Sequence, residues 1–138
     1  MSGQEPLAEA DPTDSVEVRV SRGVNASLSH VWEVLVSPVG TEALLGAGAV
    51  LGGKGEPYHC ADGAHGVLRS YHPLEQLRVS WHADADGPAS VVEVDLREDG
   101  GATVLDLNQQ HLTGAQAEGL HDRWSAALDL LAQRAESQ

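Results

Sequence analysis

Alternating apolar and polar residues predict a strand over Val16-Glu-Val-Arg-Val20, because every second side chain of a strand points to the same side of its sheet. The next apolar residues recur at the three- and four-residue spacing of one face of a helix. They are Leu28, Val31, Trp32 and Leu35. Pro38 predicts the end of this helix, since the residue before a proline avoids helical geometry. A second short helical segment is expected over 41–45.

Short runs with strand character fill the middle of the chain, and turns that contain glycine separate them. The runs cover residues 56–61, 66–72, 76–82, 90–98 and 102–111. The turn Asp99-Gly100-Gly101 lies between the last two runs, and such a turn between alternating segments predicts a hairpin. Because the connections are short, the strands are expected to pair antiparallel.

A long helix is predicted at the end of the chain. Thr113-x-x-Gln116 has the pattern of a capping box, in which two side chains satisfy the first free N–H groups of a helix. Apolar residues follow at helical spacing: Ala117, Leu120, Trp124, Leu128 and Leu131. The pattern predicts a helix of about 22 residues, or about 33 Å, with Gly119 inside it.

The order of these elements predicts the fold class. An antiparallel sheet with one apolar face needs a cover, and the long helix is the element available for it. We therefore expect an α+β fold: a curved antiparallel sheet of six to seven strands wrapped around the C-terminal helix, with two short helices after the first strand. A single domain should span 15–136, preceded by a disordered acidic tail over 1–14.

Charge excludes several classes of partner. The chain has 138 residues, of which 21 are acidic and 8 basic, giving a net charge of −13. This acidic protein should bind neither nucleic acid nor an anionic membrane surface, because both require positive charge. No segment approaches the roughly 20 apolar residues of a membrane span, and the N-terminus lacks the basic region of a signal peptide. We therefore expect a cytoplasmic protein.

Two sequence patterns partly match known cofactor or metal sites. The run from Gly48 to Gly55 approximates a phosphate-binding loop, but Gly55 replaces the hydroxyl residue and a strand rather than a helix follows. Cys60, His65 and His72 lie close in sequence, yet their spacing is not that of a zinc ligand pair. We therefore expect no cofactor, no metal site and no catalytic nucleophile.

Four short motifs carry a resemblance to a known superfamily. They are Val31-Trp-Glu-Val-Leu-Val-Ser-Pro38, then Asp62-Gly-x-x-Gly-Val-Leu68 with Leu77-x-x-x-Trp81, then Gly101-x-Thr-x-Leu-x-Leu107, and finally Trp124-x-x-x-Leu128-x-x-Leu131. In this order they resemble the SRPBCC (START-like, helix-grip) superfamily, in particular the branch named after the activator of the heat-shock-protein-ninety ATPase.

The resemblance implies a range of functions, because the superfamily includes lipid and hormone carriers, polyketide cyclases and aromatases, and co-chaperones. It favours a pocket between sheet and C-terminal helix that binds a small hydrophobic or aromatic molecule without catalysis. One alternative is a polyketide cyclase or aromatase-like enzyme, with His72 and Tyr58 as an acid–base pair. Another is a chaperone-modulating or other protein-interaction domain, acting on a protein partner or as a homodimer.

The inner face of the predicted sheet supplies the candidate ligand-binding residues. In the run 66–72 the alternation leaves two choices, and the family pattern favours the face of Leu68. The candidates are Tyr58, Leu68, Ser70, His72, Val79, Trp81, Leu105, Leu107, Gln109 and Trp124. An apolar cavity with a few polar groups is the usual form of a small-molecule site. The same aromatic residues can instead fill the core, and both interpretations remain open.

Overall fold

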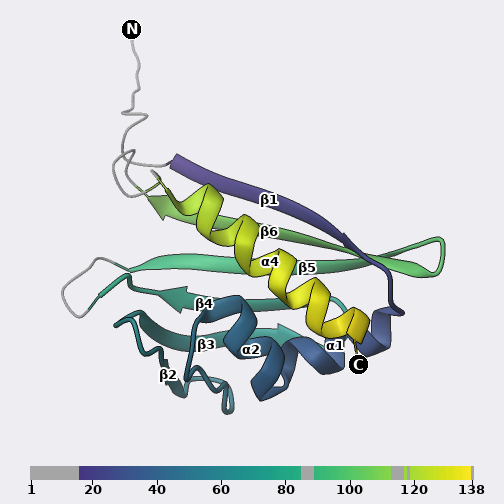
Figure 1. Ribbon diagram of the computed structural model, residues 1–138. Helices are drawn as coiled ribbons and strands as arrows, with labels where there is room; N and C mark the ends of the chain where they lie inside the picture. Colours follow the sequence, from purple (N-terminus) through teal and green to yellow (C-terminus); the bar gives the residue numbers. More distant parts are fainter. Residues whose placement is uncertain (1–15, 85–88, 113–116, 118, 138) are drawn as a thin grey trace, which may run out of the picture.

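A computed structural model of the protein describes residues 16–84, 89–112, 117 and 119–137 (Figure 1). The predicted acidic tail and the predicted capping residues Thr113 and Gln116 lie outside the described residues. The elements are β1 (Val16–Val24), α1 (Leu28–Val36), α2 (Pro38–Leu45), β2 (Pro57–His59), β3 (His65–His72), β4 (Gln76–Trp81), β5 (Ser90–Asp99), β6 (Ala102–Leu112) and α4 (Leu120–Ser137).

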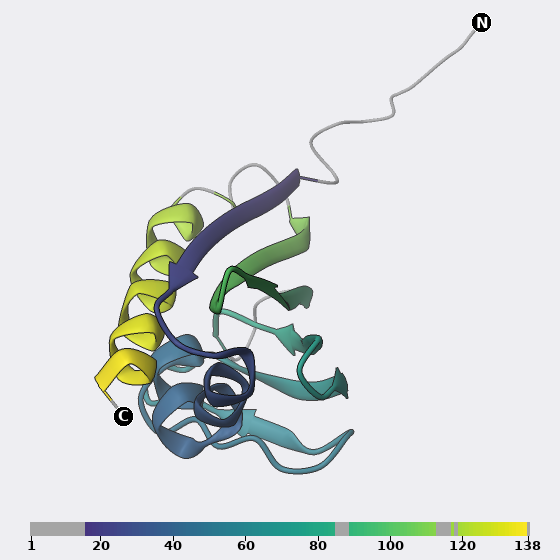
Figure 2. The same cartoon turned by 90° about the vertical axis from the view of Figure 1, so that its right-hand side faces the viewer.

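The strands form one curved antiparallel sheet, and the helices lie on one side of it. The strand order is β1-β6-β5-β4-β3-β2, so β1 crosses over to pair with β6. Figure 2 shows the sheet bending around α4, with α1 and α2 beside it. The predicted fold class is confirmed: six strands, two short helices after the first strand, and a helix at the C-terminal end.

The predicted hairpin between the last two strands is also confirmed. Asp99 of β5 pairs with Ala102 of β6, leaving a two-residue turn. Both turn residues have positive φ, 60° at Gly100 and 87° at Gly101. Glycine is favoured at both positions because this type of hairpin turn needs a left-handed backbone conformation at each of its two turn residues.

The two short helices meet at Ser37. The Ser37 side chain caps α2 by accepting a hydrogen bond from the Gly40 N–H, and its own N–H bonds the Val34 carbonyl of α1. Pro38 ends α1 as predicted, but it is also the first residue of α2, where the missing N–H has no consequence. The second helix therefore begins three residues earlier than predicted.

The C-terminal helix is shorter than predicted. It begins at Leu120, and the preceding Gly119 has a φ of 83°, which is left-handed rather than helical backbone. The prediction that Gly119 lies inside the helix is therefore wrong. The predicted apolar stripe is correct, because Leu120, Trp124, Leu128 and Leu131 are all buried. The face of α4 that meets the sheet is thus the one that the spacing indicated.

Candidate functional site

Two buried tryptophans fill the space between the sheet and α4. The Trp81 and Trp124 rings meet edge to face, with centroids 5.6 Å apart. The indole N–H of Trp124 donates to Gln109 Oε1 at 2.6 Å, and Gln109 Nε2 donates to Ser90 Oγ at 2.8 Å. These polar groups therefore hold the core together instead of facing an open cavity.

Most of the remaining predicted inner-face residues are buried in the same core. Tyr58 is 1% exposed, and its hydroxyl donates to the Ser80 carbonyl at 2.6 Å. Burial raises the pKa of the Tyr58 hydroxyl well above its ordinary value. The predicted apolar residues are buried as well: Leu68, Val79, Leu105 and Leu107. In this part of the interior the aromatic residues fill the core, which was the second of the two open interpretations.

A β-bulge in β3 changes which residues face inward. Leu68 lies opposite Val79, but the next pair is Ser70 with Arg78, so β3 has one extra residue between them. One extra residue reverses the alternation, because side chains change sides at every position. Ser70 is therefore only partly buried and His72 is exposed. The prediction that both share the face of Leu68 is wrong, and Tyr71 takes the inner side, opposite Leu77.

A cavity of about 240 Å³ lies at the end of the interior where β3 and β4 meet α1, and we call it the edge cavity. Its lining residues come from α1, from the glycine-rich loop and from the two strands. They are Trp32, Val36, Leu51, Gly52, Leu68, Tyr71 and Leu77. Of the predicted ligand-binding residues, Leu68 alone belongs to this lining. Tyr71 and Val36 stand at its mouth, 48% and 39% exposed.

The glycine-rich loop forms one wall of the edge cavity. The Gly55 N–H donates to the Leu68 carbonyl at 2.7 Å, and the Leu68 N–H donates to the Glu56 carbonyl at 3.1 Å. A side chain at Gly52 would collide with Glu56, whose carboxylate oxygen lies 2.0 Å from the ideal Cβ position. The loop is thus bound to β3 and carries a carboxylate, which disfavours a phosphate at this place.

The opposite end of the interior is closed by Arg123. Its guanidinium lies over the Trp81 and Trp124 rings, 5.1 and 5.4 Å from their centroids. It also donates to the Leu45 carbonyl at 3.1 Å and pairs with Asp62 at 3.3 Å. A backbone hydrogen bond from Ala64 and the nearby guanidinium lower the pKa of Asp62. Entry to the interior from this end would require displacing a bonded cation.

Three histidines lie side by side where β2, β3 and β4 meet. The His65 and His82 rings stack with centroids 4.5 Å apart, and His59 lies 6.3 Å from His65. Cys60 is buried, and burial raises the pKa of its thiol. Within the described ranges, no group of three or more His, Cys, Asp or Glu residues is arranged to hold a metal ion.

The sequence patterns missed most of the edge cavity. Trp32 and Leu77 appeared in the predicted motifs, but helical and strand spacing alone assigned them to the core. Leu51 and Gly52 lie in the glycine-rich run, whose sequence predicts a flexible loop at the rim of a pocket but does not single out these two residues. With the face of Leu68 inward, strand alternation predicts Tyr71 on the outer face, because nothing in the run 66–72 indicates a bulge. A signal did exist in the adjacent residues Val50 and Leu51, which are unusually apolar for a glycine-rich loop.

A curved antiparallel sheet closed by a C-terminal helix, with a cavity opening beside the first helix, defines a helix-grip protein of the SRPBCC (START-like) class. The chain belongs to the family described as "Activator of Hsp90 ATPase homolog 1-like protein", whose model matches residues 25–136. No curated protein matches the chain. Among the described residues, no helix is long and apolar enough to cross a membrane.

Solved structures share this fold at low sequence identity. DynU16, a putative protein in the dynemicin biosynthetic locus, is 23% identical with a TM-score of 0.74, over 91% of this chain and 48% of that chain. This chain thus spans about half the length of DynU16. MLL2253 from Mesorhizobium loti is 20% identical with a TM-score of 0.75, over 86% and 95% of the two chains. The Aha1 dimer from Colwellia psychrerythraea is 15% identical with a TM-score of 0.71, over 88% and 96%.

Proposed function

We propose that this protein binds a small aromatic or hydrophobic molecule in the edge cavity, without catalysing a reaction on it. The observation that carries the proposal is an apolar cavity with an open mouth, walled by Trp32, Leu68 and Leu77. Sites for small molecules are mostly apolar and hold a few polar groups that orient the ligand. The cavity of about 240 Å³ is slightly smaller than the usual range of about 300–1,000 Å³, so the ligand should be small.

Two polar groups at the edge cavity favour an aromatic ligand with an oxygen substituent. Neither the indole N–H of Trp32 nor the hydroxyl of Tyr71 has a hydrogen-bond partner among the described residues. Tryptophan and tyrosine side chains combine an apolar body with one polar group, and their rings pair well with other rings. A phenol or an aryl ketone offers both an aromatic ring for these rings and an oxygen that can hydrogen-bond to the free polar groups.

The enzymatic alternative loses its predicted acid–base pair. Tyr58 lies opposite Gly66 in the sheet, whereas His72 lies six residues further along β3, a separation of about 20 Å at 3.3 Å per residue. Two groups so far apart do not act on one bond, because proton transfer needs hydrogen-bond distance. A cyclase would therefore need other groups, and Tyr71 is the one that lines the cavity.

Binding of 2-naphthol tests the proposal. We expect amide NMR shifts to concentrate on residues around Trp32, Leu68 and Leu77, with the naphthol recovered unchanged after incubation. Leu51→Trp should fill the cavity and weaken binding at least tenfold, because Leu51 lines it. Val50→Trp is the matched control, since Val50 is 58% exposed and does not line the cavity. Equal binding by both variants, or no binding by the native protein and a panel of phenols, would contradict the proposal.

A further inference from the structure

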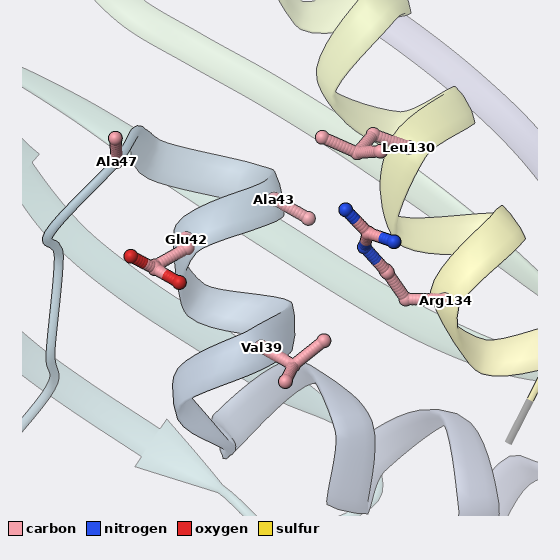
Figure 3. Close-up of a pocket in the computed structure, with 6 residues that line it drawn as sticks. All are labelled: Val39, Glu42, Ala43, Ala47, Leu130 and Arg134. Atoms are coloured by element: carbon pink, nitrogen blue, oxygen red, sulfur yellow. The ribbon is translucent and has the colours of Figure 1, made fainter.

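A second cavity lies on the outside of the molecule, between α2 and α4. It has a volume of about 430 Å³ and is lined by Val39, Glu42, Ala43, Ala47, Leu130 and Arg134 (Figure 3). We call it the helix groove. A neighbouring hollow shares Glu42, Ala43, Ala47 and Leu130 with it and extends along α4 past Ala126 towards Arg123. No residue of the edge cavity lines the helix groove, so the two sites are separate.

The helix groove is apolar along most of its length. Ala43 of α2 and Ala47, just beyond the end of that helix, line it, and their small side chains leave the hollow open. Val39 and Leu130 border it and are 40% and 36% exposed. In Figure 3 the Leu130 side chain points from α4 towards α2, across the groove. An extended aliphatic chain would cover these exposed apolar atoms, and their removal from water favours binding by about 25 cal/mol per Å².

Arg134 provides a cation at one end of the groove. Five of the eight basic residues of the chain pair with a carboxylate, namely Arg19, Arg22, Arg78, Arg97 and Arg123. Arg134 has no carboxylate within ion-pairing distance among the described residues. The acidic residue of the groove, Glu42, already accepts a hydrogen bond from the Gly48 N–H at 2.8 Å. The Arg134 guanidinium therefore lies at the groove with its charge unpaired by any described carboxylate.

We propose that the helix groove binds an aliphatic carboxylate, with the carboxylate at the Arg134 guanidinium and the chain across Ala43 and Leu130. A guanidinium matches a carboxylate in shape and can bind it with two hydrogen bonds. One uncompensated cation suits a head group with a single negative charge, and Glu42 nearby disfavours a doubly charged phosphate. The volume matches a small ligand, whereas a protein partner would need a much larger contact area.

Decanoate is the probe, used below its micelle concentration, with 1-decanol as the uncharged analogue. We expect decanoate to shift the amide NMR signals of residues 39–47 and 126–134, and to bind more weakly as the NaCl concentration rises. Arg134→Gln should weaken decanoate binding about fivefold, the upper range for an exposed ion pair, and leave decanol unchanged. Arg69→Gln is the matched control, because Arg69 is also exposed and pairs with none of the described carboxylates but lies on β3, away from the groove.

A second variant tests the apolar part of the site. Leu130→Gln removes an exposed apolar side chain without changing charge, so it should weaken both decanoate and decanol and preserve the fold. The proposal is overturned if decanoate does not bind, if Arg134→Gln and Arg69→Gln behave alike, or if the shifts concentrate around Trp32 and Leu77. The last result would show that the edge cavity takes aliphatic ligands and would leave the proposed function standing. Failure of 2-naphthol to bind, in contrast, has no bearing on the helix groove.

Discussion

Gln109 is the buried polar residue on which the core hydrogen bonds depend. It is 0% exposed, and its amide connects Trp124 of α4 to Ser90 of β5. Ser90 in turn donates to the Trp81 carbonyl at 3.1 Å. A side chain that both donates and accepts is needed here, because a buried indole N–H without an acceptor destabilises the fold.

Replacing Gln109 with leucine should therefore lower the free energy of unfolding. The variant leaves the Trp124 N–H without an acceptor, and an unsatisfied buried group costs about 1–3 kcal/mol. The Ser90 hydroxyl loses the hydrogen bond from Gln109 but keeps its own to the Trp81 carbonyl. Urea denaturation followed by tryptophan fluorescence measures the loss. Gln110→Leu is the control, because Gln110 is exposed and should change stability by about 0.5 kcal/mol or less. Similar losses in the two variants would mean that the buried network contributes nothing specific.

Asp95 is an acidic side chain in an unfavourable position on the outer face of the sheet. It lies opposite Asp106 in the β5–β6 pairing. Partial burial raises the pKa of the Asp95 carboxyl, the neighbouring Glu93 and Asp106 add to the rise, and a hydrogen bond from Gln76 opposes it. A raised pKa means that the folded protein binds this proton more tightly than the unfolded chain, so ionisation of Asp95 destabilises the fold.

Asp95→Asn should therefore stabilise the protein at pH 7 by up to about 1 kcal/mol. The amide can keep the hydrogen bond from Gln76 and removes the repulsion. The advantage should shrink as the pH falls through the folded-state pKa of Asp95 and vanish near pH 3, where the native carboxyl is protonated in both states. Urea unfolding at pH 7 and near pH 3 measures the stability difference between the variant and the native protein. Glu98→Gln is the control, because Glu98 is exposed. A gain that persists at pH 3 would show that packing, not charge, is responsible.

At the scale of elements, the contact between α1 and α2 depends on the absence of a side chain at Gly40. A Cβ built there would lie 1.8 Å from the Val34 carbonyl oxygen and 2.9 Å from the Leu35 Cα. Both are backbone atoms, so no side chain can rotate away. The two helices therefore meet in one arrangement, which places Trp32 and Val36 at the edge cavity on one side and Val39 at the helix groove on the other.

Gly40→Ala should destabilise the protein by about 3 kcal/mol, the upper part of the range for overpacking, although alanine is the better helix former. Gly23→Ala is the matched control, because a Cβ at Gly23 of β1 meets nothing within 4 Å. Thermal unfolding measured by circular dichroism distinguishes them: the first variant should melt several degrees lower, and the second should stay close to the native protein. If Gly40→Ala were as stable as the native protein, α1 and α2 would have another way to pack.

Elements differ in how well the sequence predicted them. The strands of the hairpin β5–β6 were predicted almost to the residue, because alternation and a turn with two glycines are both local signals. The bulge in β3 was not predicted, since one extra residue in a strand is defined by the pairing partner and not by the strand itself. Ser70, Tyr71 and His72 were consequently assigned to the wrong sides of the sheet.

At the scale of the whole molecule, the exposed apolar side chains are not scattered. Among the described residues six large ones are at least 36% exposed, and four of them line the two cavities: Val36, Tyr71, Val39 and Leu130. Single exposed apolar residues are ordinary, but exposed apolar atoms gathered at cavities mark binding sites. The molecule thus has two distinct surfaces where an apolar ligand would remove hydrophobic atoms from water.

The sequence by itself determined the class of fold, the order of the elements and the residues of the core, because periodicity and turns act over a few neighbouring positions. Tertiary structure decided where an opening exists. Ten inner-face residues formed one set by pattern, but Trp81, Gln109 and Trp124 pack into a closed, hydrogen-bonded core, while Leu68 borders a cavity. Whether neighbouring side chains touch or leave a gap depends on how a bulge, a loop and two helices meet, and no local pattern specifies that.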